Sequence, residues 1–566
     1  MTGLPPISRG PDESEAASRT LIDDLLAEQQ ELTAVERFSR AHDAHEVRNR
    51  IYRDLLPATP PAPGQQYAFE VDLDKCSGCK ACVSACHSMN GLDDDETWRG
   101  VGMLVGDPAD DFRARRGAAA FQQHVTTACH HCVDPACLNG CPVLAYDKDP
   151  LTGIVRHLDD QCIGCQYCVM MCPYEVPQYS KARGIVRKCD MCSSRLAVGE
   201  APACVQACPT SAIKITVIEQ AKVRGKYRQL STLNFHPTTT TTETRNNFLA
   251  ASPNPAITLP TTRFVTQRTF PENLFAGDSA SARRADPHLP LVILLTFSQC
   301  AVGASGAAVF VQPALPLLLL ALAVGLVALI AGSLHLGQPL KAWRSFLGWR
   351  KSWFSREVIA MSAFVFFVTL AAGAMWSPAV QPFEKFFAPC AALAGLLTVT
   401  CSAMIYVDTR RDFWNAPRSF TKFFGTTLLL GTAGAFTTLA FTGADPAALV
   451  GSGVTLMIAT VCKLACERRI FDQLVDEETP APTPLNKTAR LLAGELNGFV
   501  RARIALGIFG GLLLPLLAIF QLPTNAPAIP ALAIAALGLC IAGEFIERYL
   551  FFTAVVAQKM PGGLSA

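Results

Sequence analysis

Residues 129–142 read CHHCVDPACLNGCP, and residues 162–173 read CIGCQYCVMMCP. Each stretch brings four cysteines close together and ends on a proline. The second has the spacing C-x2-C-x2-C-x3-C-P, and the first differs only by two inserted residues. Three thiolates in such a tight loop can hold one 4Fe–4S cluster, while the fourth, at the start of the next helix, points to a second cluster. The two stretches therefore predict a pair of iron–sulfur clusters.

Two further cysteine groups flank this pair, one before it and one after it, so that sixteen of the 22 cysteines lie between residues 76 and 208. A zinc ribbon would need two separated C-x2-C knuckles around one ion, and only the last group could pass for that pattern. We therefore expect four 4Fe–4S clusters. Their sixteen predicted ligands are Cys76, Cys79, Cys82, Cys86, Cys129, Cys132, Cys137, Cys141, Cys162, Cys165, Cys168, Cys172, Cys189, Cys192, Cys204 and Cys208.

The assignment of cysteines to clusters depends on how the groups pair. In a two-cluster ferredoxin, the fourth cysteine of each group binds the cluster held by the other group. We expect the two middle groups to pair in this way. The two outer groups would then pair in the same way. The four expected sets are Cys76, Cys79, Cys82 and Cys208; Cys86, Cys189, Cys192 and Cys204; Cys129, Cys132, Cys137 and Cys172; and Cys141, Cys162, Cys165 and Cys168.

The overall composition indicates a chain with two different environments. Half of the residues are hydrophobic and 17% are charged, below the roughly 25% usual for soluble domains. The net charge of +2 gives no reason to expect a nucleic acid partner. Residues 1–20 contain no apolar stretch and no twin-arginine pair, so we expect no secretory signal and reduced thiols in the cytosol.

The second half of the chain reads as a membrane protein. From residue 288 onward, eight apolar stretches are each long enough to cross a bilayer as a helix of about 20 residues. One or two such stretches are found in soluble proteins, but eight together predict an all-α polytopic membrane domain. The expected spans are 290–312, 315–334, 357–376, 386–406, 423–442, 446–465, 500–521 and 529–552.

Basic residues in the connecting loops predict the orientation of this domain. Sixteen lysines and arginines fall in the loops on the side of the cysteine-rich region, and only Lys385 falls on the other side. Basic loops face the cytoplasm in most membrane proteins. We therefore expect the cysteine-rich region on the cytoplasmic side of a bacterial inner membrane.

The chain divides into four expected regions. Residues 1–66 form an amphipathic helical arm, with apolar positions at helical spacing before a proline-rich break. Residues 67–221 form an α+β, ferredoxin-like domain with four clusters. Residues 222–287, rich in threonine and proline, read as an extended tail and linker. Residues 288–566 form the eight-helix membrane domain.

Two titratable residues stand at neighbouring span ends on the basic side. His335 closes the second span within SLHLGQP, and Glu357 opens the third within SREV. An imidazole and a carboxylate beside the ring hydroxyls of a quinol could bind it and accept its two protons. The alternative is structural: His335 caps a helix, and Glu357 pairs with a loop arginine. Spacing alone does not separate these two hypotheses.

The sequence resembles a known family in both halves. The runs CHHCVDPACLNGCPVLAY, CIGCQYCVMMCPYEVPQY and RKCDMCSSRLAVGEAPACVQACPTSAI resemble the four-cluster electron-transfer subunit of the dimethyl sulfoxide reductase family of molybdoenzymes, over roughly residues 67–220. The stretches TFSQCAVG, SLHLGQP and SREV resemble the eight-helix anchor subunit of the same family. The chain is thus similar to two subunits fused end to end, the second beginning near His288.

This resemblance implies a function for the chain and its residues. His335 and Glu357 are expected at a site for menaquinone or ubiquinone, and Tyr406, Arg410 and Trp414 are weaker candidates for the same site. Electrons would pass between the membrane quinone pool and a separate molybdopterin catalytic subunit, so no substrate site is expected on this chain. The bilayer is the other expected partner.

Two alternatives remain open from the sequence. The same conduit could run in reverse for a cytoplasm-facing sulfite dehydrogenase. An ion-translocating redox module would need several acidic residues within the spans, and the sequence offers few, chiefly Glu544 and Glu547.

Overall fold

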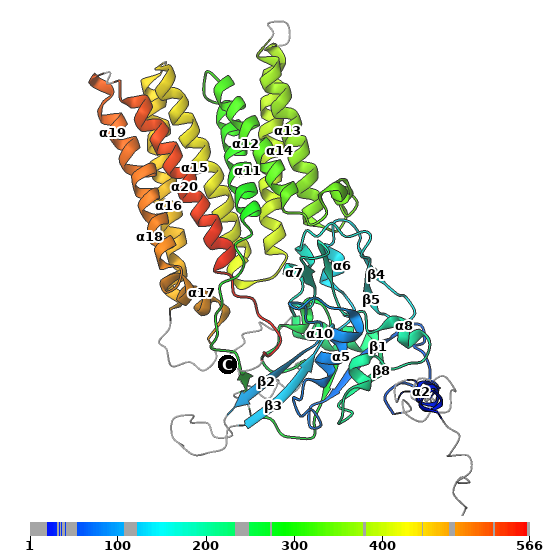
Figure 1. Cartoon of the computed structure of the whole chain (residues 1–566). Coiled ribbons are helices and arrows are strands. Elements are labelled where there is room, and N and C mark those ends of the chain that lie inside the picture. Colours follow the sequence, from blue (N-terminus) through cyan, green and yellow to red (C-terminus); the bar gives the residue numbers. More distant parts are fainter. Residues whose placement is uncertain are drawn as a thin grey trace, which may run out of the picture.

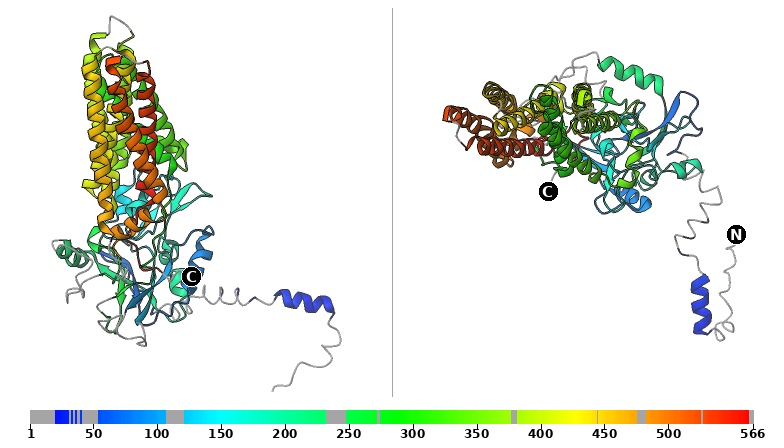
Figure 2. Two further views of the ribbon diagram at one scale, coloured as in Figure 1. Left: turned by 90° about the vertical axis from the view of Figure 1, so that its left-hand side faces the viewer. Right: turned by 90° about the horizontal axis from the view of Figure 1, so that it is seen from above.

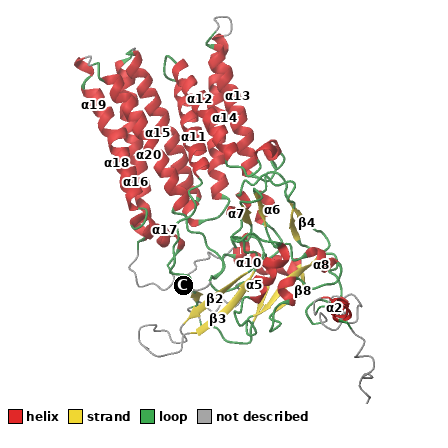
Figure 3. Cartoon of the chain, in the orientation of Figure 1, coloured by secondary structure: helices red, strands yellow, loops and turns green. Residues whose placement is uncertain are grey.

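The computed structural model describes residues 20–30, 33, 36, 40, 54–106, 121–231, 248–271, 274–376, 381–443, 445–474, 482–524 and 527–562. A domain of short strands and helices comes first, and a bundle of long helices stands on it (Figures 1 and 3). This is the α+β domain followed by an all-α membrane domain that the sequence predicts.

The N-terminal arm is described only in part. Helix α2 (Leu21–Gln30) begins after Thr20, whose backbone N–H and hydroxyl both donate to the Asp23 carboxylate, as in a capping box. It lies apart from the rest of the chain (Figure 2), with Leu21 and Leu25 76% and 52% exposed. The remaining apolar positions of the predicted arm, at 32, 35 and 38, lie outside the described residues.

A three-stranded sheet forms part of the first domain. Strand β1 (Gln65–Asp72) pairs antiparallel with β8 (Ile213–Glu219), so that Phe69 lies opposite Ile215. Both side chains are buried, facing a small core with cysteines of the first and last groups. The helices that follow these cysteine loops are α5 (Ala81–Asn90) and α9 (Ala203–Gln206), which pack against each other.

The middle cysteine groups build a second, similar unit next to the bundle. Their short helices α6 (Ala136–Gly140) and α7 (Tyr167–Met171) also pack against each other. Two antiparallel hairpins surround them, β4 (Tyr146–Lys148) with β5 (Val155–His157) and β6 (Gln178–Ser180) with β7 (Ile185–Arg187). Helix α8 (Ser193–Ala197) follows in the last cysteine group.

The expectation of an extended linker over residues 222–287 needs correction. This segment begins within α10 (Gln220–Ser231), includes the 3-10 turn η2 (Pro255–Ile257), and adds two edge strands. Strand β9 (Arg263–Val265) joins the free edge of β1, and β10 (Phe275–Ala276) joins the hairpin of β2 (Gly100–Gly106) and β3 (Phe121–Thr127). Each open edge had unpaired backbone groups that these strands satisfy.

The described residues include eight helices long and apolar enough to cross a membrane, as predicted. They run side by side (Figure 2). The helices are α11 (Leu289–Ala308), α12 (Leu315–Leu334), α13 (Trp353–Ala374), α14 (Glu384–Val407), α15 (Ala416–Thr442), α16 (Pro446–Arg468), α18 (Asn497–Ile508) continuing into α19 (Leu514–Phe520), and α20 (Ile529–Thr553). Helix α15 begins before the predicted residue 423 because Asn415 caps it, accepting from the Arg418 N–H at 3.1 Å.

Small residues bring the two halves of the bundle together. Helices α11 and α15 cross where Gly303 meets Gly431, and a Cβ atom on Gly303 would lie 2.2 Å from the carbonyl oxygen of Thr427. Any larger residue would push the helices apart. Close packing through small residues is typical of helices in membranes, where no hydrophobic effect drives their association.

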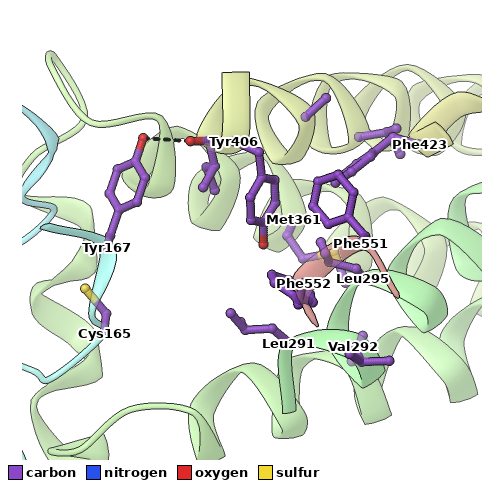
Figure 4. Packing of buried hydrophobic residues seen from close by; sticks show 14 of the residues in the cluster. Cys165, Tyr167, Leu291, Val292, Leu295, Met361, Tyr406, Phe423, Phe551 and Phe552 are labelled. Carbon is purple, nitrogen blue, oxygen red and sulfur yellow. Dashed lines mark hydrogen bonds between the residues drawn. The ribbon is translucent and has the colours of Figure 1, made fainter. Parts of the chain in front are cut away.

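The bundle is joined to the first domain by direct hydrogen bonds. The loop after α12 continues into a 3-10 segment, η3 (Pro339–Phe346). In this loop the Gln338 N–H donates to the Ile163 carbonyl at 3.0 Å. At the start of α13, the Ser352 hydroxyl donates to the Gly140 carbonyl at 2.7 Å. The Tyr167 hydroxyl, at the start of α7, donates to the Ile405 carbonyl of α14 at 3.2 Å (Figure 4). These bonds fix the middle cysteine groups against the helices.

The segment after α20 returns to the first domain. The Gly562 carbonyl accepts from the Met103 N–H at 3.0 Å, extending the edge of β2, and Lys559 forms an ion pair with Asp278 at 2.8 Å. The chain therefore enters and leaves the eight-helix bundle on the same face.

Candidate functional site

The structure collects the sixteen cysteines into the four sets expected from the spacing. We number them by distance from the bundle, the farthest first: quartet 1 (Cys76, Cys79, Cys82, Cys208), quartet 2 (Cys86, Cys189, Cys192, Cys204), quartet 3 (Cys129, Cys132, Cys137, Cys172) and quartet 4 (Cys141, Cys162, Cys165, Cys168). Quartets 1, 3 and 4 each line a small cavity. In quartet 2, Cys86 lies within electrostatic range of both Cys192 and Cys204.

The loops between the cysteines are shaped by glycine. Gly78 and Gly164, each directly before the second cysteine of its group, have φ values of +76° and +69°. Gly164 also lies where three segments meet, because a Cβ atom on it would be 2.3 Å from the Gly184 carbonyl oxygen and 2.9 Å from the backbone of Gly337. A side chain at this position would therefore separate quartet 4 from the membrane helices.

The donor set fits iron–sulfur clusters. Quartets of thiols surround hollows, and in the described part of the chain no three His, Cys, Asp or Glu side chains converge closely enough to hold one metal ion. Burial raises the pKa of the Cys86 thiol to about 12 and that of the Cys141 thiol to about 11. Ligation requires thiolates, so a bound metal group would have to displace these protons.

Arg99 provides a second observation that favours an anionic group between quartets 1 and 2. Its guanidinium is buried over the Phe69 ring, 4.6 Å from the centroid, and Nη1 donates to the Thr126 hydroxyl at 3.2 Å. Its Nε and Nη2 atoms are buried without a partner. The thiols within electrostatic range are Cys82 of quartet 1 and Cys86, Cys189 and Cys204 of quartet 2. A buried cation with two unused donors needs nearby negative charge, which thiolate-ligated clusters supply.

Lys188 occupies the corresponding place between quartets 2 and 3. It is 3% exposed, and its ammonium lies 3.8 Å from the Cys129 sulfur and 2.8 Å from the Cys189 carbonyl oxygen. It also bonds the Val155 carbonyl. One buried cation thus lies between quartets 1 and 2, and another lies between quartets 2 and 3.

Removing either cation should lower the reduction potential of the adjoining clusters. Charge near a cluster sets its potential, and a charge-assisted hydrogen bond contributes roughly 1.5–3 kcal/mol, equivalent to on the order of 100 mV for one electron. Arg99→Gln and Lys188→Met should show this fall in redox titrations followed by EPR. Arg99→Lys, which keeps the charge, is the control, and unchanged potentials in both neutral variants would contradict an electrostatic role.

Quartet 4 lies against the membrane helices at His335. The His335 side chain hydrogen-bonds the backbone of Cys165, and its ring packs edge-to-face on the His288 ring with centroids 5.7 Å apart. Burial and the neighbouring His288 lower the pKa of His335 to about 4. His288 in turn contacts Phe552 near the end of α20. The structure therefore places His335 at the contact between the cysteine domain and the bundle.

Glu357 faces the interior of the bundle one helix further on. Its carboxylate is buried and accepts a hydrogen bond from the Ser402 hydroxyl of α14. Tyr406 and Tyr167 both lie within its electrostatic range. Within the described part of the chain, the hydrogen-bond partner of Glu357 is therefore a neutral serine and not the loop arginine of the structural alternative. The group of polar side chains near quartet 4 thus comprises residues from α7, α13 and α14.

The three weaker candidates occupy different positions. The Tyr406 ring packs on Trp414 with centroids 5.1 Å apart, and both belong to a buried aromatic cluster with Phe551 and Phe552. Figure 4 shows Tyr406 beside Phe551 and Phe552. The Trp414 indole N–H donates to the Phe551 carbonyl at 3.0 Å, which is a packing role. Arg410 is exposed and lines a shallow cavity between the domain and the bundle.

Sequence reasoning missed the buried neighbours of these residues. Arg411, not Arg410, points to the cysteine domain: it lies over the Trp414 ring, 5.1 Å from its centroid, and donates to the Met170 carbonyl at 3.4 Å. His288 and Ser402 were also missed. The position of His288 directly before a membrane span is a signal that sequence analysis could have used. No spacing pattern, by contrast, separates Arg411 from its neighbour Arg410 or marks Ser402 within its span.

A second buried polar cluster crosses α15, α16, α18 and α20. Glu544 pairs with Lys463 and with Arg503, the latter at 2.7 Å, while Glu547 pairs with Lys422 at 2.9 Å and with Arg548. Of the two acids that an ion-translocating module would use, Glu544 is thus held by two cations and Glu547, which Lys463 also approaches to 3.9 Å, by three. This arrangement favours a structural role.

Comparison with known proteins agrees with both halves of the chain. The family described as "4Fe-4S dicluster domain" matches residues 120–218, and the family described as "DMSO reductase anchor subunit (DmsC)" matches residues 285–554. The probable anaerobic dimethyl sulfoxide reductase chain YnfG of Escherichia coli strain K12 is 38% identical over 157 residues, which are 28% of this chain and 76% of the relative. Another anaerobic dimethyl sulfoxide reductase subunit of the same strain is 36% identical over 166 residues, 29% of this chain and 80% of the relative.

The relatives also include subunits of other complexes. The iron–sulfur subunit of the nitrate-inducible formate dehydrogenase of the same strain is 37% identical over 172 residues, 27% of this chain and 57% of the relative. The chain is therefore an iron–sulfur electron-transfer protein with its own multi-pass membrane anchor. It belongs to the dimethyl sulfoxide reductase family, as a fusion of that family's iron–sulfur subunit with the DmsC type of anchor.

Proposed function

We propose that the chain carries electrons between a membrane quinone and a separate molybdopterin-containing catalytic subunit through four 4Fe–4S clusters. The observation that supports this most strongly is the continuous line of cysteine quartets from an exposed end to the membrane helices. Bound clusters would supply one-electron relay along this line. Residues of this chain define the inner and the outer end of this electron path.

The inner end is the group of His335, Glu357, Ser402 and Tyr406 beside quartet 4. A quinol releases two protons together with its two electrons, so its site needs proton acceptors near an electron acceptor. His335 contacts the backbone of a quartet 4 cysteine, and Glu357 is a buried carboxylate on the adjoining helix. These two side chains would orient the ring of menaquinone or ubiquinone and accept or return its protons.

The outer end is quartet 1. Cys79 is exposed, whereas all four cysteines of quartet 4 are buried. A cluster there would lie near the protein surface, where another subunit can approach it. The relatives named as subunits of a dimethyl sulfoxide reductase and of a formate dehydrogenase support a catalytic partner at this surface. Fusion to the anchor keeps the clusters at a high effective concentration beside the quinone site.

The metal content tests the four clusters directly. Sixteen thiolates in four quartets predict about sixteen irons, with matching acid-labile sulfide, in each anaerobically purified chain. Elemental analysis of the full chain measures this. About eight irons would mean that only one pair of quartets is loaded, and zinc in place of iron would contradict the proposal.

Topology tests the cytoplasmic placement that we propose for the iron–sulfur domain. Because basic residues gather on that face and the C-terminal segment returns to it, a C-terminal alkaline phosphatase fusion should be inactive while a green fluorescent protein fusion should fluoresce. The reverse pair of results would place the iron–sulfur domain outside the cytoplasm.

A cytoplasmic iron–sulfur domain is also compatible with the opposite direction of electron flow, from the catalytic partner to the quinone. If the catalytic partner oxidises its substrate in the cytoplasm, as a sulfite dehydrogenase would, the same residues would deliver protons to a quinone. Rates measured with the purified complex in both directions, with quinol plus an S-oxide and with sulfite plus quinone, distinguish the two.

A further inference from the structure

A large cavity opens in the membrane domain away from the proposed quinone site. It measures about 440 Å³ and lies between α15, α16, α18 and α20. The ends of these helices that line it face the iron–sulfur domain. Figure 1 shows the four helices. Neither His335 nor Glu357 lines it. Its floor is the polar cluster around Lys463 and Arg503.

The charge of the cavity is strongly positive. Its lining contains two acidic residues, Glu467 and Glu547, and six basic ones: Arg418, Lys422, Lys463, Arg468, Arg469 and Arg503. The cations deep in the cavity are already neutralised. Arg503 pairs with Glu467 at 3.1 Å, and Lys422 pairs with Glu547 at 2.9 Å.

The positive charge that remains is at the mouth. Arg418 donates to the backbone carbonyl of Asp412 at 3.2 Å and also lies within electrostatic range of the Asp412 carboxylate, whereas Arg468 and Arg469 are exposed. Within the described residues, whose nearest gap is 475–481, neither Arg468 nor Arg469 forms an ion pair. Three guanidiniums around one opening suit an anion, since each can donate two hydrogen bonds to one phosphate.

The wall beside the mouth is apolar and faces outward. Leu464, Val500 and Ile504 line it, with Ile504 44% exposed. In a bilayer this opening would lie at the interface where the headgroups meet the acyl chains. The occupant must therefore be both anionic and apolar. Inorganic phosphate has no apolar part, and a quinone ring has no negative charge.

We propose that this cavity binds an anionic phospholipid of the cytoplasmic leaflet, with its phosphodiester on Arg418, Arg468 and Arg469 and an acyl chain along Leu464 and Ile504. Basic pockets between transmembrane helices on this side of a membrane are suited to such headgroups. The lipid would fill the gap between α16 and α18 and complete the half of the bundle that does not carry the quinone site.

The test is native mass spectrometry of the delipidated full chain in detergent. Cardiolipin, phosphatidylglycerol, phosphatidylcholine and inorganic phosphate are added separately to the wild type and to Arg418→Gln/Arg468→Gln/Arg469→Gln. We expect one high-affinity anionic lipid on the wild type, at least tenfold weaker binding to the triple variant, and no such site for phosphatidylcholine or phosphate. Comparing the two anionic lipids shows whether one phosphate suffices.

Two further variants test whether a loss of lipid binding is specific to the proposed site. Arg344→Gln/Arg350→Gln/Lys351→Gln removes the same charge from the loop before α13 and should leave lipid binding unchanged. Ile504→Trp narrows the apolar part without changing charge and should weaken binding of long-chain lipids. Equal binding of phosphatidylcholine, unchanged binding to the triple variant, or loss of co-purified quinone instead of lipid would each overturn the proposal; the last would mark a second quinone site.

Discussion

Replacing His335 with alanine or Glu357 with glutamine should lower quinone-linked electron transfer by roughly 100-fold or more, the scale for losing a positioned proton acceptor. Neither residue is a predicted cluster ligand, so the iron content and the cluster EPR signals should stay unchanged. Electron transfer between the clusters and artificial donors or acceptors should also persist. Quinone-coupled turnover of the purified complex is the measurement.

The control for these two variants is a substitution close to His335 at a residue that takes no part in proton transfer. Ser333 is exposed near the end of α12, and among the described residues its hydroxyl donates only to the Leu329 carbonyl of its own helix. Ser333→Ala should therefore behave as wild type. If His335→Ala and Glu357→Gln also keep full quinone turnover, both residues are structural and the quinone binds elsewhere in the bundle.

The second large effect concerns stability. Glu544→Gln should destabilise the membrane domain by about 3–5 kcal/mol, because Lys463 and Arg503 stay buried and both lose one of their carboxylate partners. Thermal unfolding of the purified chain in detergent, followed by circular dichroism, measures this. Glu495→Gln, at an exposed pair 3.8 Å from Arg284, should change stability by less than about 1 kcal/mol.

The same variant separates a structural role from ion translocation. A structural Glu544 predicts lower thermal stability and normal quinone turnover per folded complex. A stable Glu544→Gln protein that loses redox-driven proton movement in vesicles would instead revive the translocation hypothesis.

Sequence analysis could predict those features that require a fixed residue spacing or a minimum length of apolar sequence. Eight apolar stretches correspond to eight helices because a span needs about 20 apolar residues in a row. The cysteine groups are visible for a similar reason, since cluster chemistry demands fixed spacings. The assignment of Cys141 and Cys172 to each other's groups follows from that chemistry, and the cavities of quartets 3 and 4 agree with it.

Single residues that act through burial could not be predicted. Arg99 and Lys188 are ordinary charged residues in sequence, and only the fold places them between cysteine quartets. Strand β9 has three residues and resembles a linker in sequence, because its place depends on the open edge of β1. The choice between Arg410 and Arg411 likewise depends on which side chain the turn directs to Trp414.

One measurement tests electron transfer between quinone and clusters within this chain most directly. The purified chain, without a catalytic partner, is reduced with dithionite and mixed anaerobically with a naphthoquinone, and its iron–sulfur absorbance is followed by stopped flow. We predict rapid reoxidation in the wild type and a rate at least about 100-fold lower in His335→Ala. Equal rates in both proteins, or no reoxidation of clusters that ferricyanide still oxidises, would contradict a quinone site at quartet 4.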